Sequence, residues 1–252
     1  MVENDLSKTL KKSPSDYRHL IYQTYEPEPP TEKDYQRWAR STHARIKDWL
    51  PQDHDTPILD LGCGAGYFLY LLGTLGYRDV TGVDLCPARV HMARRMAPGA
   101  RVLEGEARGM LADNPGRFGL ITAFDFLEHF PKAEILPLLS LIAEALRGGA
   151  RVIFQTPNGE SPWVGTVGYG DFTHEWFFTP GSLAQLLKKA GLTAFIAREC
   201  GPQAHGVKSF ARLLFWQILK AVMLFWNLVE TGMAGSGIFT RVFLATAVKP
   251  IS

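Results

Sequence analysis

Residues 58–68 read ILDLGCGAGYF, and this stretch decides the fold. Its first four residues, 58–61, have the apolar character of a buried strand, and a helix is expected over about 65–75. Between them stand Gly62, Gly64 and Gly66, which let the backbone approach a ligand closely at the start of a helix. A strand, a glycine loop and a helix in this order predict a site for a nucleotide-like cofactor.

Strand-like and helix-like runs alternate on both sides of this stretch. Further strands are predicted at 79–85, 101–106, 119–125, 150–157, 193–199 and 240–249, and further helices at 87–96, 132–146 and 181–190. Regular alternation favours βαβ units, in which a mostly parallel sheet carries helices on both faces. The predicted fold class is therefore α/β, a Rossmann-like sheet of seven strands.

The composition is that of an ordinary soluble protein. The chain has 252 residues, of which 46% are hydrophobic, and its formal net charge of +2 is too small for a binder of nucleic-acid backbones. Cys63, Cys86 and Cys200 form neither a disulfide framework nor a zinc motif, which favours a reducing compartment. The polar N-terminus lacks the apolar stretch of an export signal, so we expect a cytoplasmic protein.

Two aspartates flank the glycine loop. Asp60 precedes Gly62 by two residues, and Asp84 ends the second strand, where an acid can bind both ribose hydroxyls. A dinucleotide fingerprint would need glycine where Tyr67 stands, which argues against a nicotinamide cofactor. A negative charge at Asp60 suits an ammonium group, and S-adenosylmethionine carries one.

Five motifs, ILDLGCGAGYF, VTGVDL, LEGEA, FGLITAFDFLEHF and LRGGARVIFQTPN, together resemble class I S-adenosylmethionine-dependent methyltransferases over about residues 55–200. The resemblance implies that the last strand is antiparallel. It also implies cofactor contacts from Asp60, Gly62, Cys63, Gly64, Gly66, Asp84, Leu85, Glu106, Ala107, Phe124 and Asp125, with Asp84 on the ribose and Glu106 and Ala107 beside the adenine. For Cys63 the alternative is a small residue in a tight turn.

Methyl transfer to a hydroxyl requires a base near the end of the fourth strand. Asp125, Glu128 and His129 are spaced to share one face if their segment is helical. His129 is the first candidate base, with Glu128 beside it. The alternative for the two acids is an acidic turn that caps the next helix.

The same D-x-x-E-H pattern resembles the E-x-x-E-H metal cluster of ubiquinone-pathway O-methyltransferases. That resemblance implies a possible divalent cation, such as magnesium, on Asp125, Glu128 and His129.

Residues 158–180 form a loop rich in glycine and aromatic residues that contains a second candidate base, His174. The loop resembles that of methyltransferases of bacterial surface-glycan biosynthesis, and its aromatic rings suit a sugar or a quinoid ring. The expected reaction is O-methylation of a sugar hydroxyl in a glycan, glycolipid or nucleotide sugar. The alternatives are magnesium-dependent methylation of a phenolic or quinone-precursor hydroxyl, and a non-catalytic binding module at a membrane. For His174 itself the alternative is a structural hydrogen bond within the loop.

The predicted organisation has four parts. Residues 1–50 form a tail and a helical lid, in which Tyr22 or Tyr25 closes over the cofactor. Residues 51–199 form the cofactor-binding core, 200–239 an apolar helical insertion, and 240–252 the final strand.

Within the insertion, 207–229 is nearly long enough to span a membrane, but charged residues interrupt it and disfavour a crossing. Arg212, Lys220 and Asn227 form one polar stripe. The rest of this helix is apolar and is expected to pack on the sheet or on a second copy in a homodimer. Alternatively, it lies on a membrane surface with Trp216 and Trp226 near the headgroups. Contact of Lys208 and Arg212 with a phosphate or an anionic sugar is a further alternative.

Overall fold

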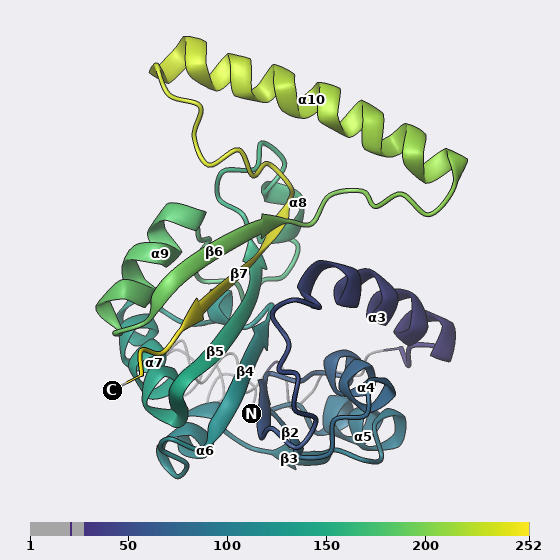
Figure 1. Ribbon diagram of the computed structural model, residues 1–252, viewed down its shortest axis with the longest axis vertical. Helices are drawn as coiled ribbons and strands as arrows, with labels where there is room; N and C mark the ends of the chain where they lie inside the picture. Colours follow the sequence, from purple (N-terminus) through teal and green to yellow (C-terminus); the bar gives the residue numbers. More distant parts are fainter. Residues whose placement is uncertain (1–20, 22–27, 252) are drawn as a thin grey trace, which may run out of the picture.

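A computed structural model describes residues 21 and 28–251 of the chain (Figure 1). Its centre is a seven-stranded sheet in the order β3-β2-β1-β4-β5-β7-β6. The strands are β1 (Ile58–Leu61), β2 (Val80–Asp84), β3 (Arg101–Glu104), β4 (Phe118–Phe124), β5 (Leu146–Pro157), β6 (Thr193–Glu199) and β7 (Val242–Val248). Strands β1 to β5 pair in parallel, and β7 runs antiparallel between β5 and β6. The predicted α/β class and the antiparallel last strand are confirmed.

Helices cover both faces of this sheet (Figure 1). They are α3 (Glu32–Ile46), α4 (Tyr67–Thr74), α5 (Pro87–Met96), α6 (Ala107–Ala112), the 3-10 turn η1 (Leu127–His129), α7 (Lys132–Ala145), α8 (Gly165–Gly168), α9 (Pro180–Lys189) and α10 (Val207–Thr231). The strand order reverses between β1 and β4, and ligands of open α/β sheets bind where the order reverses. The predicted cofactor residues lie in or just after the last residues of β1, β2, β3 and β4.

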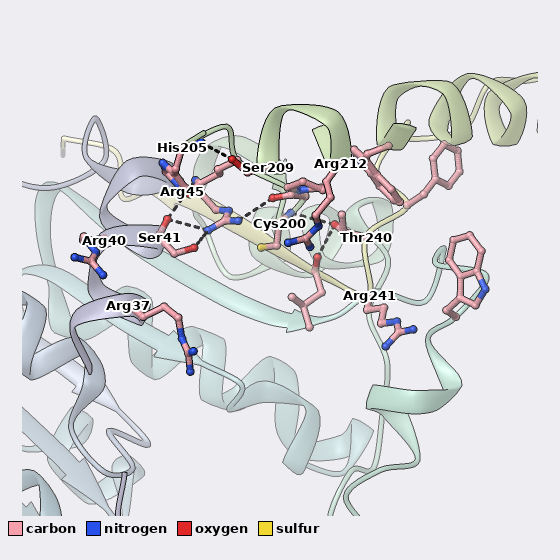
Figure 2. A pocket seen from close by; sticks show the side chains of 17 residues that line it. Arg37, Arg40, Ser41, Arg45, Cys200, His205, Ser209, Arg212, Thr240 and Arg241 are labelled. Carbon is pink, nitrogen blue, oxygen red and sulfur yellow. Dashed lines mark hydrogen bonds between the residues drawn. The ribbon is translucent and has the colours of Figure 1, made fainter. Parts of the chain in front are cut away.

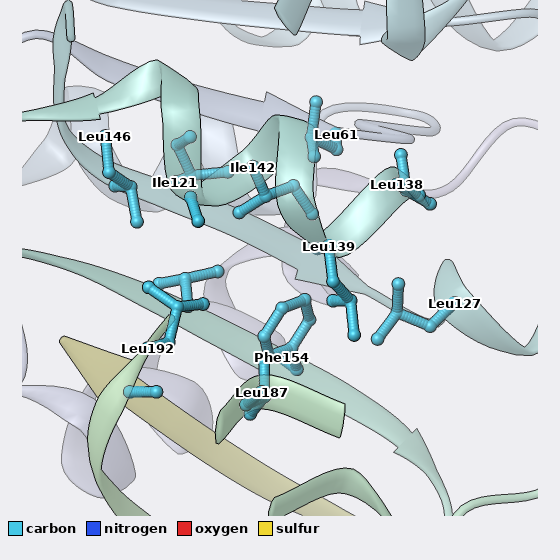
Figure 3. Close-up of a cluster of buried hydrophobic side chains, with 14 of the residues drawn as sticks. Leu61, Ile121, Leu127, Leu138, Leu139, Ile142, Leu146, Phe154, Leu187 and Leu192 are labelled. Carbon is cyan, nitrogen blue, oxygen red and sulfur yellow. The ribbon is translucent and has the colours of Figure 1, made fainter. Parts of the chain in front are cut away.

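Two apolar clusters hold the helices to the sheet. One lies between the sheet and α7 and α9 and includes Leu139, Ile142, Phe154 and Leu187 (Figure 3). The other lies on the opposite face, under α3, α4 and α5. Strands β1 and β2 are buried along their whole length, as parallel strands covered on both faces must be. This burial fixes the positions of the loops that follow these strands.

Helix α10 stands away from this core. It lies beyond one end of the sheet on two linkers, and none of its 25 residues is buried (Figure 1). The expectation that the insertion packs on the protein's own sheet is therefore wrong: only a few side chains of the helix reach the domain. Residues 1–20 and 22–27, including Tyr22 and Tyr25, lie outside the described residues, so their predicted role over the cofactor stays a prediction.

The polar stripe of α10 faces the domain, and its apolar stripe faces outward. Lys220 Nζ and Trp216 Nε1 each donate to the Glu199 carboxylate at 3.2 Å, at the end of β6. The outward side chains, all more than half exposed, are Phe215, Ile218, Val222, Phe225, Trp226 and Val229. A surface helix of a globular protein has the opposite orientation. Trp216 consequently does not share the outward face with Trp226, contrary to expectation.

Candidate active site

The glycine loop adopts a backbone that only glycine adopts easily. Gly62, Gly64 and Gly66 have φ values of 64°, 52° and 86°. A Cβ on Gly66 would lie 2.9 Å from the Cα of Ala93, so this glycine also lets α4 and α5 approach each other. The Tyr35 hydroxyl of α3 donates to the Ala65 carbonyl at 2.7 Å. Helix α3 therefore holds the loop from the outside.

Asp84 is fixed by two backbone amides. Gly64 N donates to its Oδ2 at 2.9 Å, and Cys86 N donates to its Oδ1 at 2.8 Å. Each carboxylate oxygen retains a lone pair for a ligand hydroxyl. The aspartate is thus oriented before any ligand arrives.

A cleft beside Asp84 gathers six of the eleven residues predicted to bind the cofactor, namely Gly62, Asp84, Leu85, Glu106, Ala107 and Asp125. His129 also lines this cleft, together with Val83, Arg89, Gly105, Phe126 and Phe130. None of these last five was singled out from the sequence. Both phenylalanines belong to the fourth motif, so their place beside Asp125 and His129 in that motif was the available signal.

The cleft is nearly closed by the Phe126 side chain. Its volume is about 60 Å³, whereas pockets for drug-sized ligands have roughly 300–1,000 Å³. A Cβ on Gly62 would lie 2.6 Å from Cδ2 of Phe126, so this ring rests directly on the glycine. The Phe126 ring therefore occupies space next to the glycine loop.

Other predicted cofactor residues lie behind the cleft. The Asp60 carboxyl is buried and accepts a 2.7 Å hydrogen bond from the Thr122 hydroxyl, and burial, assisted by the charge of Asp84, raises its pKa to about 7. Cys63 Sγ fills the space over Gly82, where a Cβ would lie 2.9 Å away, and burial raises the pKa of its thiol. This packing favours the structural interpretation of Cys63. Gly64 and Gly66 shape the loop without lining the cleft.

The Phe124 ring, also predicted at the cofactor, lies elsewhere. It packs against the rings of Phe68 and Trp38, with centroid distances of 5.1 and 5.7 Å. These contacts join β4 to α4 and α3. Phe124 therefore belongs to the support of the site.

The two candidate bases meet. The backbone carbonyl of Glu128 accepts hydrogen bonds from the amides of Glu175 and Trp176, at 2.7 and 3.2 Å, which ties the aromatic loop to η1. This brings the His174 ring to 4.8 Å from the His129 ring, centroid to centroid. Sequence spacing predicted neither this contact nor its backbone anchor, because 45 positions separate the two histidines.

His129 is oriented by a chain of hydrogen bonds. The Thr173 hydroxyl donates its proton to Asp171 Oδ1 at 2.7 Å, so it must accept the proton of His129 Nδ1, which lies 2.9 Å away. The Thr173 amide also donates to Asp171 Oδ1, at 2.8 Å. Burial opposes ionisation of Asp171, but the hydrogen bonds from Thr173 and the two imidazoles hold its pKa below the usual value. Neutral His129 then carries its lone pair on Nε2.

His174 has the same tautomer for a similar reason. Its Nδ1 lies 2.8 Å from the carbonyl oxygen of Gly168, which only accepts, so Nδ1 carries the proton. Hydrogen-bonded in this way, the imidazole leaves Nε2 as its basic nitrogen. The structural hydrogen bond expected as the alternative for His174 is present, and it leaves one nitrogen available for chemistry.

Glu128 contributes a buried carboxyl to the two imidazoles. One oxygen, Oε2, accepts from the Thr156 hydroxyl at 3.2 Å, and Oε1 has no hydrogen-bond partner among the described residues. Burial and the nearby Asp125 charge raise the pKa of Glu128 well above its usual value. A neutral carboxyl is therefore favoured at this position.

Asp125 does not join this cluster, which corrects the predicted metal site. Its carboxylate accepts from Gln155 Nε2 at 2.9 Å, and its backbone has φ of 49°, so the helical turn begins only at Leu127. Instead, atoms of Glu128, His129 and His174 lie within 4.8 Å of one another. One carboxyl and two imidazoles do not fit magnesium, which prefers oxygen ligands.

Comparison with known proteins agrees with this geometry. A family model described as a methyltransferase domain matches residues 31–195. A ubiquinone biosynthesis O-methyltransferase of Methylocella silvestris is 30% identical over 192 residues, covering 66% of this chain and 72% of that protein. The corresponding protein of Pseudoalteromonas translucida is 28% identical over 153 residues, covering 55% of this chain and 64% of its own length. The match thus leaves more than a third of that second relative uncovered.

Solved structures share the fold. An S-adenosylmethionine-dependent methyltransferase from Archaeoglobus fulgidus superposes with a TM-score of 0.62 at 20% identity, covering 84% of this chain and 94% of that one. A phosphoethanolamine N-methyltransferase of Haemonchus contortus, solved with S-adenosylhomocysteine, gives 0.58 at 18% identity and covers 84% of this chain and 53% of that one. With the family match and the sheet order, these findings establish that the chain belongs to the methyltransferase domain family and has the fold of S-adenosylmethionine-dependent methyltransferases.

Proposed function

We propose that this enzyme methylates a hydroxyl group and that His129 is the base. The hydrogen-bond chain from Asp171 through Thr173 to His129 Nδ1 carries this proposal, because it fixes the basic nitrogen as Nε2. His129 also lines the cofactor cleft. A hydroxyl acceptor must lose a proton during transfer, and an oriented imidazole is suited to take it. The Asp171 carboxylate stabilises the imidazolium that forms.

When bound, S-adenosylmethionine supplies the methyl group as a sulfonium substituent. The residues of the chain perform the remaining tasks. Asp84 orients the ribose, and the carboxylates that border the cleft favour a cationic ligand. His129 would accept the proton of the acceptor hydroxyl at Nε2 during the transfer. His174, beside it, provides a second imidazole on the acceptor side.

For the acceptor we propose a sugar hydroxyl in a glycan, glycolipid or nucleotide sugar. The loop beside His174 presents Tyr169 and Phe172 with 81% and 96% of their surface exposed, and such rings stack on sugar faces. The second candidate is a phenolic hydroxyl of a quinone precursor, which the names of the ubiquinone-pathway relatives favour. A non-catalytic role is not favoured for a chain that retains both the cleft and the base.

An acceptor panel tests these candidates. The enzyme is incubated with methyl-labelled S-adenosylmethionine and nucleotide sugars, lipid-linked oligosaccharides or catechols, and the labelled product is identified by mass spectrometry. We expect an O-methyl sugar as the labelled product, and we expect it to form equally well in the presence of EDTA. Label only on a catechol, lost with EDTA and restored by magnesium, would establish the second candidate instead.

We further propose a cytoplasmic enzyme that rests on the inner face of a membrane through α10. The helix is long and apolar enough to cross a membrane by length and composition, with mean hydropathy of 1.4 over its most apolar window. Both of its ends, however, return to the same edge of the sheet, since β6 and β7 are paired neighbours. Residues 232–241 would have to recross the bilayer as non-helical chain, which hydrocarbon does not tolerate. A helix lying in the interface meets both constraints.

Vesicle co-sedimentation tests this placement. Replacing Phe215 and Phe225 with Glu puts charges on the outward stripe and should lower binding to anionic vesicles at least ten-fold. Gln217→Glu, which adds one such charge away from that stripe, serves as the control. If the Phe variants bind vesicles normally but convert a dimer to a monomer in light scattering, the stripe is a homodimer surface instead.

A further inference from the structure

A second and much larger cavity lies beside α10, and neither the predicted cofactor contacts nor the proposed bases account for it. It has a volume of about 860 Å³. Its walls come from α3, the segment after β6, the first turns of α10 and the start of β7 (Figure 2). Among the described residues, five arginines and a histidine line it, namely Arg37, Arg40, Arg45, Arg212, Arg241 and His205, and no aspartate or glutamate does. We call it the arginine cavity.

Most of this positive charge is uncompensated within the described chain. Arg37 pairs with Asp34 at 2.7 Å, and Arg45 donates to the carbonyls of Ser41 and Gly201, at 2.8 Å each. By contrast, the side chains of Arg40, Arg212 and Arg241 make no ion pair or hydrogen bond with any described residue. Like charges held around one concave space raise its positive potential, which an anionic ligand relieves.

Tertiary structure, not local sequence, collects these arginines. Isolated exposed arginines are ordinary on a protein surface, but these lie on segments up to 204 positions apart. Figure 2 shows Arg37 and Arg40 extending from α3, Arg212 from α10 and Arg241 from the chain that enters β7. The Ser41 hydroxyl also lines the cavity, whereas the hydroxyls of Ser209 and Thr240 donate to the carbonyls of Gly206 and Val242. Its shape and donors are those of a binding site for an anion.

The donor set selects phosphate. Guanidinium groups bind phosphate oxygens through two parallel hydrogen bonds, and hydroxyl donors complete such sites. The volume exceeds that of a single phosphate and falls in the range of pockets for small molecules. Trp163 and Trp216 also line the cavity and provide apolar and aromatic surface. A phosphate or diphosphate group joined to a sugar matches these features.

The cavity adjoins the catalytic residues through the backbone. The Arg241 carbonyl accepts from the amide of Asn158 at 2.9 Å, and Asn158 follows Thr156, whose hydroxyl donates to Glu128. Trp163 stands in the same loop as Gly168, the partner of His174. The chain that carries Arg241 is therefore linked by hydrogen bonds to the strand end that contacts Glu128.

We propose that the arginine cavity binds the phosphate or diphosphate group of the methyl acceptor, so that the acceptor is a sugar phosphate ester. This inference rests on the proposed hydroxyl methylation. The phosphate has two possible sources, a soluble nucleotide sugar or a lipid that reaches the cavity along α10, and both use the same arginines.

Calorimetric titration of the full chain with inorganic pyrophosphate tests the inference without catalysis. Saturable binding is expected, and the double variant Arg212→Gln, Arg241→Gln should weaken it at least ten-fold. Arg101→Gln, an exposed arginine on β3 at the far sheet edge, should leave it unchanged. Unchanged affinity for S-adenosylhomocysteine in the double variant shows that it is folded. Absent binding, or equal binding in all three proteins, overturns the proposal.

Competition separates the two sources. If a nucleoside-diphosphate sugar displaces pyrophosphate and phosphatidic acid vesicles do not, the acceptor is soluble, and the reverse result identifies a lipid. Failure of the proposed function has a different signature: pyrophosphate binds as expected, yet no hydroxyl in the acceptor panel receives label. If label is transferred to neutral hydroxyl acceptors and pyrophosphate does not bind, the proposed role of the arginine cavity is refuted. The proposed hydroxyl methylation is then retained.

Discussion

The cofactor cleft and the arginine cavity have opposite electrostatic character. In the part of the chain that the structure describes, three acids, Asp84, Glu106 and Asp125, line the cleft with a single arginine, whereas five arginines and no acid line the cavity. S-adenosylmethionine presents a sulfonium and an ammonium, and a phosphate ester presents the opposite charge. The contrast indicates that each ligand is directed to its own side and disfavoured at the other, with His129 at the cleft wall.

Replacement of Asp84 tests the acidic cofactor cleft and has the largest expected effect on ligand binding. Asp84→Ala removes the predicted ribose acceptor and leaves the amides of Gly64 and Cys86 without their partner. We expect affinity for S-adenosylhomocysteine to fall at least 100-fold in calorimetry, about 3 kcal/mol. Asp113→Ala, at the exposed end of α6, is the control. Unchanged affinity in a folded Asp84→Ala protein would show that Asp84 does not bind the ribose.

A second experiment tests the boundary between the two regions. His129→Gln keeps a polar side chain but loses the base, so kcat should fall by about 10²–10⁴. Cofactor affinity should remain within a few-fold of wild type. His91→Gln, on the exposed side of α5, should have no effect. Wild-type kcat in the His129 variant would show that the hydroxyl loses its proton elsewhere.

The hydrogen-bond chain behind His129 has a smaller predicted effect. Thr173→Val removes the hydroxyl between Asp171 and Nδ1, so the imidazolium loses its stabilisation by the carboxylate. We expect a loss of about ten-fold in kcat and a shift of the acidic limb of the pH–rate profile to lower pH. Thr173→Ser should restore both. A loss of kcat with no change in the pH profile would mean that Thr173 only supports the loop.

The smallest effect concerns Asp60, behind the cleft. Because its folded-state pKa of about 7 exceeds the ordinary 3.8, the native protein holds this proton more tightly than the unfolded chain, and stability falls as pH rises from about 4 to 7. Asp60→Asn should remove that loss and raise the free energy of unfolding at pH 8, relative to pH 5, by about 1–3 kcal/mol. Urea unfolding at both values measures it. A parallel pH dependence in the variant would place the buried charge elsewhere.

Sequence reasoning succeeded where function depends on consecutive residues. The strand, glycine loop and helix of 58–75 and the acid at Asp84 are local features, since three glycines with positive φ leave few other backbones. The alternation of strand-like and helix-like runs is also a local feature, and it predicts the seven strands and their α/β arrangement. The motif also predicted Asp125 in the cleft, where it lies.

Sequence reasoning failed where long-range contacts decide. The i, i+3, i+4 spacing assumed a helix through Asp125, but its left-handed backbone turns the carboxylate toward Gln155. The link between Thr173 and His129 depends on the amides of residues 175 and 176 meeting the Glu128 carbonyl. Likewise, nothing local to Arg37 or Arg241 indicates that they share a cavity. The orientation of α10 follows from its contacts with Glu199, which its own periodicity does not contain.

A crystal structure with S-adenosylhomocysteine is the most direct test of the cofactor position proposed between Asp84 and His129. We expect the ribose hydroxyls on Asp84, the adenine beside Glu106 and Ala107, the Phe126 ring displaced from Gly62, and the sulfur facing His129. This cofactor position is contradicted if Phe126 still covers Gly62 while the ligand binds elsewhere, or if the sulfur points away from both histidines.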